Sequence, residues 1–422
     1  MKKLKIAYIC YYSNAELRKI LHQHIPWWES FGRRIMHISP PKLVDHGIWN
    51  ENAIREIEKY DDLEVHVINP QKFISQNDIC FELRGIHYHI FRDEDSFLSM
   101  RIKTALRLNK RGAYSKNREF IRRTIESIKP QIVHVMGAEN TFYSQSLLDV
   151  PKSIPTIIQL DTLINDPIFF ENYFMSKEGY DYVAGVEREL LQKANYVATK
   201  AKKYIKIIKE HIHPNVHILE LGLPLAEPVD LEKRSTQYDF VYFAKILAKA
   251  IDYAIESFAI AYKKHPNITL DVVGSCPPSL LEEIKGRIKE LGIEHAVFFE
   301  GELPTHKDVI KQIRKARFAL LPVKISLTTG TIREAMANGL PVITTDTGEL
   351  GTQKLNDKKE CVLLSPKGDH EAMANNMIRL LNNPLLVENL IKNAGEKAHS
   401  IRSNAMVVKD WHDTYLKIAA KN

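Results

Sequence analysis

Cysteine is scarce in this chain, and its distribution limits the possible classes of protein. Only four of the 422 residues are cysteines (Cys10, Cys80, Cys276 and Cys361), and no two of them form a CxxC pair. This scatter argues against a disulfide framework or a cysteine-based zinc site and fits a reducing compartment.

Long hydrophobic runs and a strong charge excess are missing as well. No stretch reaches the roughly 18 apolar residues of a membrane span. Residues 1–12 carry lysines and a short apolar run but no small-residue cleavage site, so we interpret them as a first β-strand and expect a cytoplasmic protein. The formal net charge of +7 is small for this length and does not indicate nucleic-acid binding.

The first half of the chain alternates short β-like runs with charged amphipathic stretches. The runs are rich in β-branched and aromatic residues, as strands buried in a parallel sheet should be. They lie at 5–12, 63–69, 131–137, 155–161, 196–200 and 216–222. The clearest amphipathic stretches between them are 117–129 and 186–194.

The alternation stops at a charged segment with two prolines, residues 224–239, and then restarts. We interpret residues 226–238 as an interdomain linker. Strands are predicted beyond it at 239–244, 268–274, 296–301, 318–323, 341–345 and 361–366, with helices at 250–265 and 280–292. The chain is therefore predicted to be an α/β protein with two Rossmann-like doubly wound domains that face each other across a cleft. The domains would span 1–225 and 239–403, and a last helix at 404–422 could pack on either one.

The segment 320–351 carries the sharpest local pattern. A predicted strand ends near Val323, and Thr328, Thr329, Gly330 and Thr331 then open a helix. Free backbone N–H groups at a helix N-terminus suit an anion such as a diphosphate. Glu334 lies one turn further and could accept hydrogen bonds from ribose hydroxyls. Alternatively, Thr331 and Glu334 form a capping box that binds nothing.

The second half resembles a known family. The block REAMANGLPVITTDTGELG (333–351) is similar to the signature of group 1 (family 4) retaining glycosyltransferases of the GT-B fold. Three more stretches, at 240–275, 297–323 and 361–384, resemble other motifs of the family, and all four occur in the family's order along the chain. In the first half, HVMG, PTIIQLD, VERELLQKANYVATKA and VHILELGLP resemble family positions more loosely.

The resemblance implies roles for individual residues. Lys245 and Lys249 take the places of the family's Arg and Lys, which neutralise the donor diphosphate. Gly301, Glu302 and Leu303 fall where the nucleobase is contacted, and Glu334 matches the glutamate expected on the ribose. In this family a nucleoside-diphosphate sugar is the donor substrate, and neither a cofactor nor a metal is implied.

Several positions depart from the family pattern. Ser326 stands where the first glutamate of the E-x7-E motif is expected. In the first half the family's H-x-H reads His134-Val135-Met136, and Asp161 aligns with a later strand-end histidine. The glycine pair after the first strand is replaced by Ser13-Asn14-Ala15-Glu16, which is itself a possible capping box. Ser13, Asn14, His134 and Asp161 are the residues predicted to line the N-domain cleft.

A third feature is the basic segment 101–123. It contains one acid, Glu119, and nine basic residues: Arg101, Lys103, Arg107, Lys110, Arg111, Lys116, Arg118, Arg122 and Arg123. Such a segment either forms a solvated surface helix or lies on an anionic bilayer, and a polyprenyl-linked acceptor would favour the bilayer. The nearby Asp93-Glu94-Asp95 has the spacing of a DxD metal motif, but a surface loop is the better interpretation.

These observations predict a metal-independent, retaining glycosyltransferase of the hexosyltransferase type. It would transfer a sugar to a glycan or lipid-linked acceptor in surface polysaccharide biosynthesis, in the cytoplasm or peripherally on the inner leaflet. The alternatives are a nucleotide-sugar epimerase and a catalytically silent GT-B protein that binds a nucleotide sugar or glycan, as Ser326 and Met136 would suggest.

Overall fold

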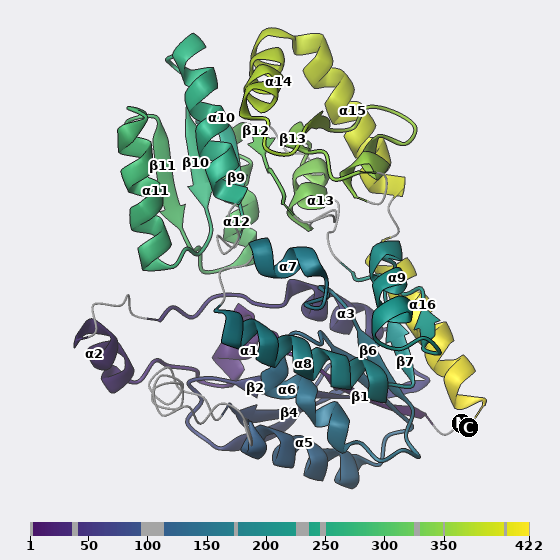
Figure 1. The fold of residues 1–422 in the computed structure, drawn as a ribbon. Helices are drawn as coiled ribbons and strands as arrows, with labels where there is room; N and C mark the ends of the chain where they lie inside the picture. Colours follow the sequence, from purple (N-terminus) through teal and green to yellow (C-terminus); the bar gives the residue numbers. More distant parts are fainter. Residues whose placement is uncertain are drawn as a thin grey trace. The chain divides into compact units, whose positions relative to one another are not determined.

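The computed structural model describes residues 3–35, 41–93, 114–172, 176–224, 236–244, 250–324, 330–348, 351–400 and 403–421 (Figure 1). The chain divides into two compact units, and each is considered by itself. Unit 1 consists of residues 1–170, 175–225 and 404–422. Unit 2 consists of residues 171–174 and 226–403.

Unit 1 is built on an eight-stranded sheet in the order β3-β4-β2-β1-β5-β6-β7-β8. Its strands are β1 (Leu4–Ile9), β2 (Leu63–Gln71), β3 (Asp78–Leu83), β4 (Ile86–Arg92), β5 (Ile132–Met136), β6 (Thr156–Gln159), β7 (Tyr196–Ala198) and β8 (His217–Leu219). All neighbours pair in parallel except β3 and β4, which form an antiparallel hairpin at one edge. The buried strands are nearly all apolar because helices cover both faces.

The helices of unit 1 form two layers. They are α1 (Ala15–Ile20), α2 (Trp27–Ile35), α3 (Ile48–Ile57), α5 (Ser115–Ile128), α6 (Thr141–Ser144), α7 (Pro167–Asn172), α8 (Lys177–Lys193), α9 (Lys202–His211) and the terminal α16 (Asn404–Ala419). The helices α1, α3 and α16 bury their apolar sides against one face of β1, β2 and β4. On the opposite face, Phe120 of α5 stacks on Phe91 of β4 with ring centroids 4.5 Å apart.

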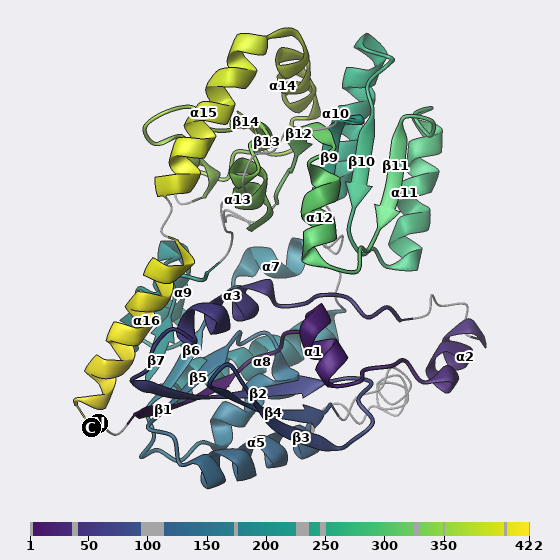
Figure 2. The same ribbon diagram turned by 180° about the vertical axis from the view of Figure 1, so that it is seen from behind.

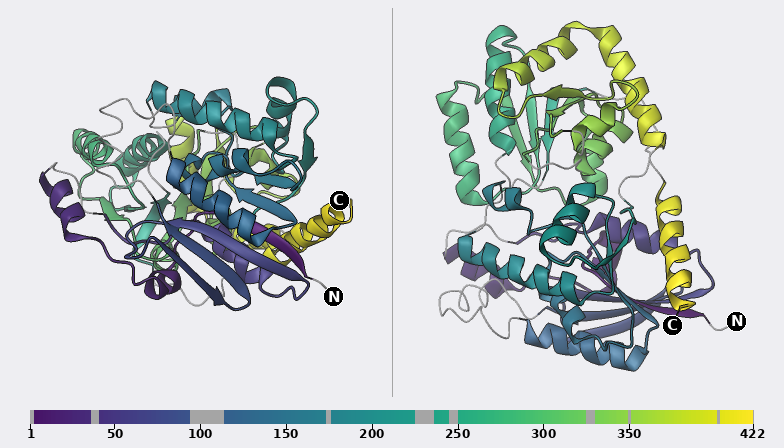
Figure 3. Two further views of the ribbon diagram at one scale, coloured as in Figure 1. Left: turned by 90° about the horizontal axis from the view of Figure 1, so that it is seen from below. Right: turned by 45° about the vertical axis from the view of Figure 1, so that its right-hand side comes forward.

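The last helix is part of unit 1. Figures 2 and 3 show α16 lying along this unit, and it packs against α3. Trp411 is fully buried and donates through Nε1 to the carbonyl of Gly222 at 3.0 Å, while His412 hydrogen-bonds Asp62 at 2.8 Å. The helix α16 thus completes the core beside β1 and β5, although it is far from both strands in the sequence.

Unit 2 contains a six-stranded parallel sheet in the order β11-β10-β9-β12-β13-β14. The strands are β9 (Tyr238–Phe243), β10 (Leu270–Val273), β11 (Val297–Gly301), β12 (Ala316–Leu320), β13 (Val342–Thr345) and β14 (Leu363–Ser365). The helices are α10 (Ala250–Lys264), α11 (Pro278–Glu290), α12 (His306–Ile313), α13 (Gly330–Ala337), α14 (His370–Asn382) and α15 (Pro384–Ser400). The strand order reverses between β9 and β12, as in dinucleotide-binding folds.

The predicted fold class is confirmed, and each strand expected from the sequence is present. The linker prediction was one residue too long, because Tyr238 already begins β9. The hairpin β3–β4 was not predicted. Its two strands alternate apolar and polar side chains, and Arg84 and Gly85 between them both have positive φ, as a tight hairpin turn requires.

Candidate functional site

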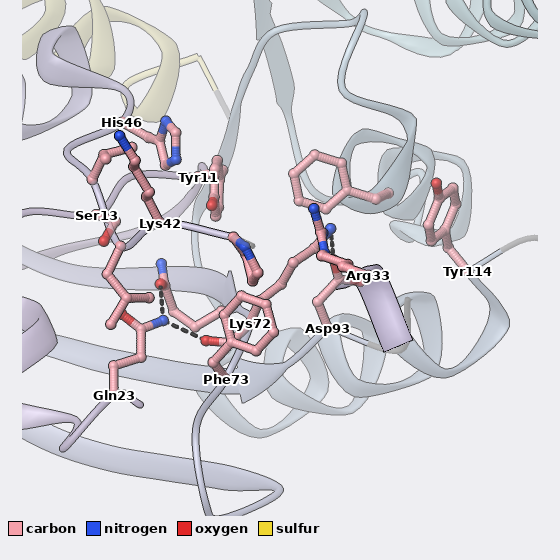
Figure 4. Close-up of a pocket in the computed structure, with 15 residues that line it drawn as sticks. Tyr11, Ser13, Gln23, Arg33, Lys42, His46, Lys72, Phe73, Asp93 and Tyr114 are labelled. Atoms are coloured by element: carbon pink, nitrogen blue, oxygen red, sulfur yellow. Dashed lines mark hydrogen bonds and ion pairs between the residues drawn. The ribbon is translucent and has the colours of Figure 1, made fainter. Parts of the chain in front are cut away.

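A pocket of about 370 Å³ lies at the carboxyl ends of the strands of unit 1 (Figure 4). Tyr11 and Ser13 follow β1, Lys72 and Phe73 follow β2, and Asp93 follows β4. Open α/β sheets bind their ligands at this edge, near the point where the strand order reverses. In unit 1 that reversal lies between β1 and β5.

Basic side chains dominate the polar lining of this pocket. Arg33, Lys42, Lys72 and His46 face a single acid, Asp93. The Asp93 carboxylate is buried, accepts from Asn117 Nδ2 at 2.8 Å and lies 3.8 Å from Lys72 Nζ. The lining therefore has more basic side chains than acidic ones, a composition that suits an anionic ligand. Asp93 departs from the predicted surface loop, because its side chain is buried in the pocket wall, while Glu94 and Asp95 lie outside the described residues.

A carboxyl group lies at the switch point itself. Glu139 follows β5, and a Cβ at Gly137 would lie 2.5 Å from its Oε1, so this folded-back side chain requires the glycine. Glu139 Oε1 accepts from Asn140 Nδ2 at 2.8 Å, while Oε2 has no partner among the described residues. Burial, with the nearby Asp161 carboxylate, raises the pKa of Glu139 to about 8. This group can hold or release a proton near neutral pH.

The four residues predicted for the N-domain cleft have different surroundings. Ser13 lines the pocket, and Asp161 is exposed just after β6. Asn14 is the N-cap of α1, where its Oδ1 accepts from Leu17 N at 2.7 Å. The possible capping box at 13–16 does not form, because Glu16 pairs with Arg84 instead.

His134 is a correction to the prediction. Its side chain is fully buried in the core of unit 1, where Nδ1 hydrogen-bonds Tyr415 Oη at 2.6 Å. It also packs edge-on against Tyr8 and Trp411. Burial lowers its pKa to about 3, so the ring is neutral. His134 is a packing residue because α16, which no local pattern places there, covers this face of β5.

In unit 2 the edge of the sheet formed by the carboxyl ends of the strands corresponds to the edge that holds the pocket in unit 1. A Cβ at Gly274, which has φ +136°, would come within 1.9 Å of the Ala244 carbonyl oxygen, so only glycine allows β9 and β10 to end so close together. Lys324 follows β12 and is 8% exposed. Its Nζ binds both carboxylate oxygens of Asp252, in the first turn of α10, at 2.9 and 2.8 Å.

The predicted nucleobase and ribose positions are near each other in unit 2. Gly301 ends β11 and, with Glu302 and Leu303, forms the loop that leads into α12. His306, the first residue of α12, places Nε2 3.2 Å from Glu334 Oε1. Glu334 of α13 thus contacts the first residue of the helix into which this loop leads.

The capping-box alternative for Glu334 is not supported. The helix α13 begins at Gly330, so Thr331 lies inside it and cannot be its N-cap, and Glu334 pairs with His306 instead. Lys245, Lys249, Ser326, Thr328 and Thr329 lie outside the described residues, and their predicted roles stay predictions.

Three residues at these edges were missed from the sequence. Glu139, Lys324 and His306 each follow a predicted strand by a few positions, which is the signal that could have identified them. Near Lys324 the threonines and the glycine at 328–331 form the more conspicuous pattern. Glu139 lies just after the HVMG motif. Proximity to a strand end is common, however, and only the structure distinguishes these side chains.

Comparison with known protein sequences finds similarity to glycosyltransferases. Residues 226–397 match the family of glycosyl transferases group 1. An exopolysaccharide phosphotransferase of Streptomyces coelicolor is 28% identical over 177 residues, which are 41% of this chain and 18% of that protein. An uncharacterized glycosyltransferase of Haemophilus influenzae is 30% identical over 138 residues, 33% of this chain and 37% of the relative. The chain thus spans well under half the length of these relatives.

Solved structures match over the full length of the chain. The sucrose-phosphate synthase of Thermosynechococcus elongatus has a TM-score of 0.71 at 16% identity and is covered completely, as is this chain. Anabaena HepE, solved with UDP and glucose, has a TM-score of 0.62 at 13% identity, covering 97% of this chain and 99% of its own. The chain therefore has the GT-B fold, and its residues 226–397 match the model of the glycosyl transferases group 1.

Proposed function

We propose that this protein is a retaining glycosyltransferase that uses a nucleoside-diphosphate sugar. The main support is the family match over 226–397 together with the geometry of unit 2. There Glu334 contacts His306, which follows the loop 301–303 at the carboxyl edge of the sheet, where a nucleoside can bind. HepE was solved with UDP and glucose, so UDP-sugars are the first donors to test.

The leaving diphosphate would be stabilised by cations and by the start of α13. In this proposal Lys245, Lys249 and the backbone N–H groups at 328–331 interact with charge that develops in the transition state. They would act in place of a metal ion, so transfer should continue in EDTA. A complete loss of activity in EDTA that added Mg²⁺ or Mn²⁺ restores would contradict this mechanism.

The decisive experiment combines a nucleotide-sugar panel with site variants. Release of nucleoside diphosphate from one donor supports a transferase, whereas binding without turnover supports the catalytically silent alternative. An interconverted sugar on an intact nucleotide would indicate an epimerase. Lys245→Ala and Lys249→Ala should each weaken nucleotide binding about ten- to a hundredfold, since a hydrogen bond to a charged group contributes roughly 1.5–3 kcal/mol.

Glu334→Gln tests the ribose contact separately. It should reduce nucleotide affinity, since the amide replaces one carboxylate acceptor with a donor. The melting temperature should change little, because Glu334 is not a cap of α13. His306→Gln is the matched variant, as it removes the imidazole but leaves the carboxylate. A large loss of stability with unchanged affinity in Glu334→Gln would contradict the ribose role.

We propose an anionic acceptor for the pocket of unit 1. Lys42 and Lys72 in its lining contribute positive charge, and a phosphate or carboxylate on a glycan or polyprenyl carrier has the complementary charge. A role in surface polysaccharide assembly fits such an acceptor, and the curated relative from Streptomyces is named as an exopolysaccharide enzyme. Lys42→Ala and Lys72→Ala should raise the KM for the acceptor without changing donor hydrolysis.

Peripheral contact with a membrane also belongs to this proposal. In α2 the aromatic and aliphatic side chains face outward: Trp27 is 77%, Phe31 56% and Ile35 64% exposed. Glu29 is buried and pairs with Arg33, so the polar side of this helix faces inward. Exposed tryptophan beside arginine is typical of helices that lie in the membrane interface.

The described part of the basic segment 101–123 fits the surface-helix alternative. Its part 101–113 lies outside the described residues. In the remainder, Arg122 and Arg123 pair with Glu119, and Arg118 pairs with Asp149. This part of α5 is an ordinary ion-paired surface helix. Within the described residues, no helix has the length and apolar character needed to span a bilayer.

Sedimentation with vesicles tests the membrane contact. The parent should pellet with vesicles that contain anionic lipid at low salt, and a variant with Trp27→Ser and Phe31→Ser should not. Leu385→Ser is the matched control, because Leu385 is an equally exposed apolar residue in unit 2. Changing Arg107, Lys110, Arg111 and Lys116 to glutamine tests the basic segment. If all four proteins pellet equally, the membrane contact is refuted.

A further inference from the structure

Three histidines gather on one face of the neighbouring strands β2 and β4 of unit 1. His66 of β2 pairs in register with His87 of β4, and His89 follows two residues along β4. Val65, Val67, Ile86, Tyr88 and Ile90 on the same strands point into the core beneath α3 and α16. Because side chains alternate along a strand, the three histidines point to the other face, toward solvent beside α5.

A carboxylate completes this group. Glu64 Oε1 lies 2.9 Å from His66 Nε2, and the rings of His66 and His87 stack with centroids 4.7 Å apart. Glu64, His66 and His87 can bring one ligand atom each to within 4.8 Å of the others. A tetrahedral zinc ion with bonds of about 2.0–2.1 Å needs its ligand atoms roughly 3.3 Å apart, so small side-chain rotations suffice.

We propose that Glu64, His66 and His87 form a binding site for a divalent first-row transition-metal ion such as Zn²⁺. Imidazole nitrogen and carboxylate oxygen are ligands that zinc accepts. The side chains of Glu64 and His87 are 30% and 38% exposed, so an ion can reach them from solvent. Water, or Glu82 at 3.7 Å from His87 Nδ1, would take the fourth position.

A chain of hydrogen bonds behind His66 supports this arrangement. His66 Nδ1 lies 3.0 Å from His89 Nε2, and His89 Nδ1 lies 3.5 Å from Cys80 Sγ. If His66 Nε2 binds the metal, its Nδ1–H donates to His89 Nε2, and His89 Nδ1–H donates to the sulfur. Every atom keeps a partner, and the tautomer of the ligand is fixed, as in established metal sites. His89 is thus a positioning residue.

One cation competes for the same carboxylate. Lys5 Nζ lies 3.0 Å from Glu64 Oε1. Zinc would have to share or displace this ion pair, which lowers the affinity of the site and provides a diagnostic variant. Lys5→Met leaves Glu64 free for the metal and should tighten zinc binding several-fold, whereas loss of a ligand weakens it.

The site is independent of the proposed transferase reaction and is tested by calorimetry. Zn²⁺ is titrated into the chelator-treated full chain, with Mg²⁺ as a control ion that prefers oxygen ligands. The parent should bind one equivalent of Zn²⁺ and no Mg²⁺. His87→Ala and Glu64→Gln should weaken Zn²⁺ binding at least tenfold, and His89→Ala by about ten- to a hundredfold.

The matched control is His211→Ala. His211 is also exposed and lies 3.8 Å from a glutamate, but it lies in helix α9 far along the chain. This variant should bind Zn²⁺ like the parent. Bound Co²⁺ should show the strong visible absorption of a four-coordinate site in the parent and lose it in His87→Ala. No Zn²⁺ binding by the parent, or equal binding by the parent, His87→Ala and Glu64→Gln, would overturn the proposal.

Discussion

Replacing Glu139 by glutamine should change how the stability of this protein depends on pH. Burial beside Asp161 raises the pKa of Glu139 from about 4.5 to about 8, so the folded protein holds a proton that the unfolded chain releases near pH 4.5. The stabilisation from this raised pKa is complete below about pH 4.5 and is lost as the pH rises through 8.

The size of the effect follows from the shift. At 1.36 kcal/mol per unit, a shift of about 3.5 units has an upper limit of about 5 kcal/mol. The true value is smaller, on the order of 2–4 kcal/mol, because the Glu139 side chain is only partly screened from water. The free energy of unfolding of the parent should therefore fall between about pH 4.5 and 8, and Glu139→Gln should remove this fall.

Urea unfolding of both proteins from pH 5 to 9 measures the difference directly. Glu187, whose pKa burial raises to about 7, is present in both proteins, so its contribution cancels. Glu119→Gln is the control, because hydrogen bonds from arginines hold the pKa of Glu119 near 2, outside this window. Parallel stability curves for the parent and Glu139→Gln would refute the reasoning. If Glu139 also holds a proton during transfer, the pH profile of kcat/KM should shift in the same variant.

Two further predictions concern the local geometry of each unit. Gly274→Ala should destabilise unit 2 by about 2 kcal/mol or more, since its Cβ would strike the Ala244 carbonyl, whereas Gly286→Ala in α11 has open space and should stabilise by roughly 0.5–1 kcal/mol in thermal unfolding. Asn14→Ala should cost about 1 kcal/mol, because the backbone N–H of Leu17 loses its cap, and Asn14→Ser should restore most of this stability. Equal melting temperatures in either pair would contradict the corresponding contact.

The sheet cores were predictable because buried parallel strands have a simple sequence pattern. Each is a short apolar run followed by an amphipathic helix, and both sheets repeat this pattern. The hairpin β3–β4 departs from it, since one of its faces is polar. Its alternation of Ile79, Phe81 and Leu83 with polar residues was a usable signal, as was the Arg84-Gly85 turn.

The sites were only partly predictable. The helix α13 and the place of Glu334 in it were predictable because β12, this helix and β13 follow one another in sequence, whereas the phosphate-binding role of the turn before the helix stays a prediction. The pocket of unit 1 collects Ser13, Arg33, Lys72 and Asp93 from separate loops, and no spacing rule connects them. The histidine cluster likewise depends on the register of β2 against β4, which the sequence does not specify.

The buried contact between β5 and α16 shows how a motif position can become part of the core. The hydrogen bond between His134 and Tyr415 tests this interpretation. Tyr415 Oη and His134 Nδ1 are 2.6 Å apart in a fully buried environment. Tyr415→Phe leaves the imidazole nitrogen without this partner and should cost about 1–3 kcal/mol of unfolding free energy, whereas the His134→Phe, Tyr415→Phe double variant removes both polar groups and should recover part of that cost. Tyr196→Phe, at a partly buried ring of β7, is the control and should be nearly neutral.

Because burial lowers the pKa of His134 to about 3, the unfolded chain binds a proton below about pH 6.5 that the folded protein excludes, so the parent should lose stability as the pH falls from 6.5 toward 3. The double variant should lose less over the same range. A single Tyr415→Phe variant as stable as the parent, or a double variant with the same acid sensitivity, would mean that His134 is not held in the core as a neutral, hydrogen-bonded ring, and its assignment to the cleft would then have to be reconsidered.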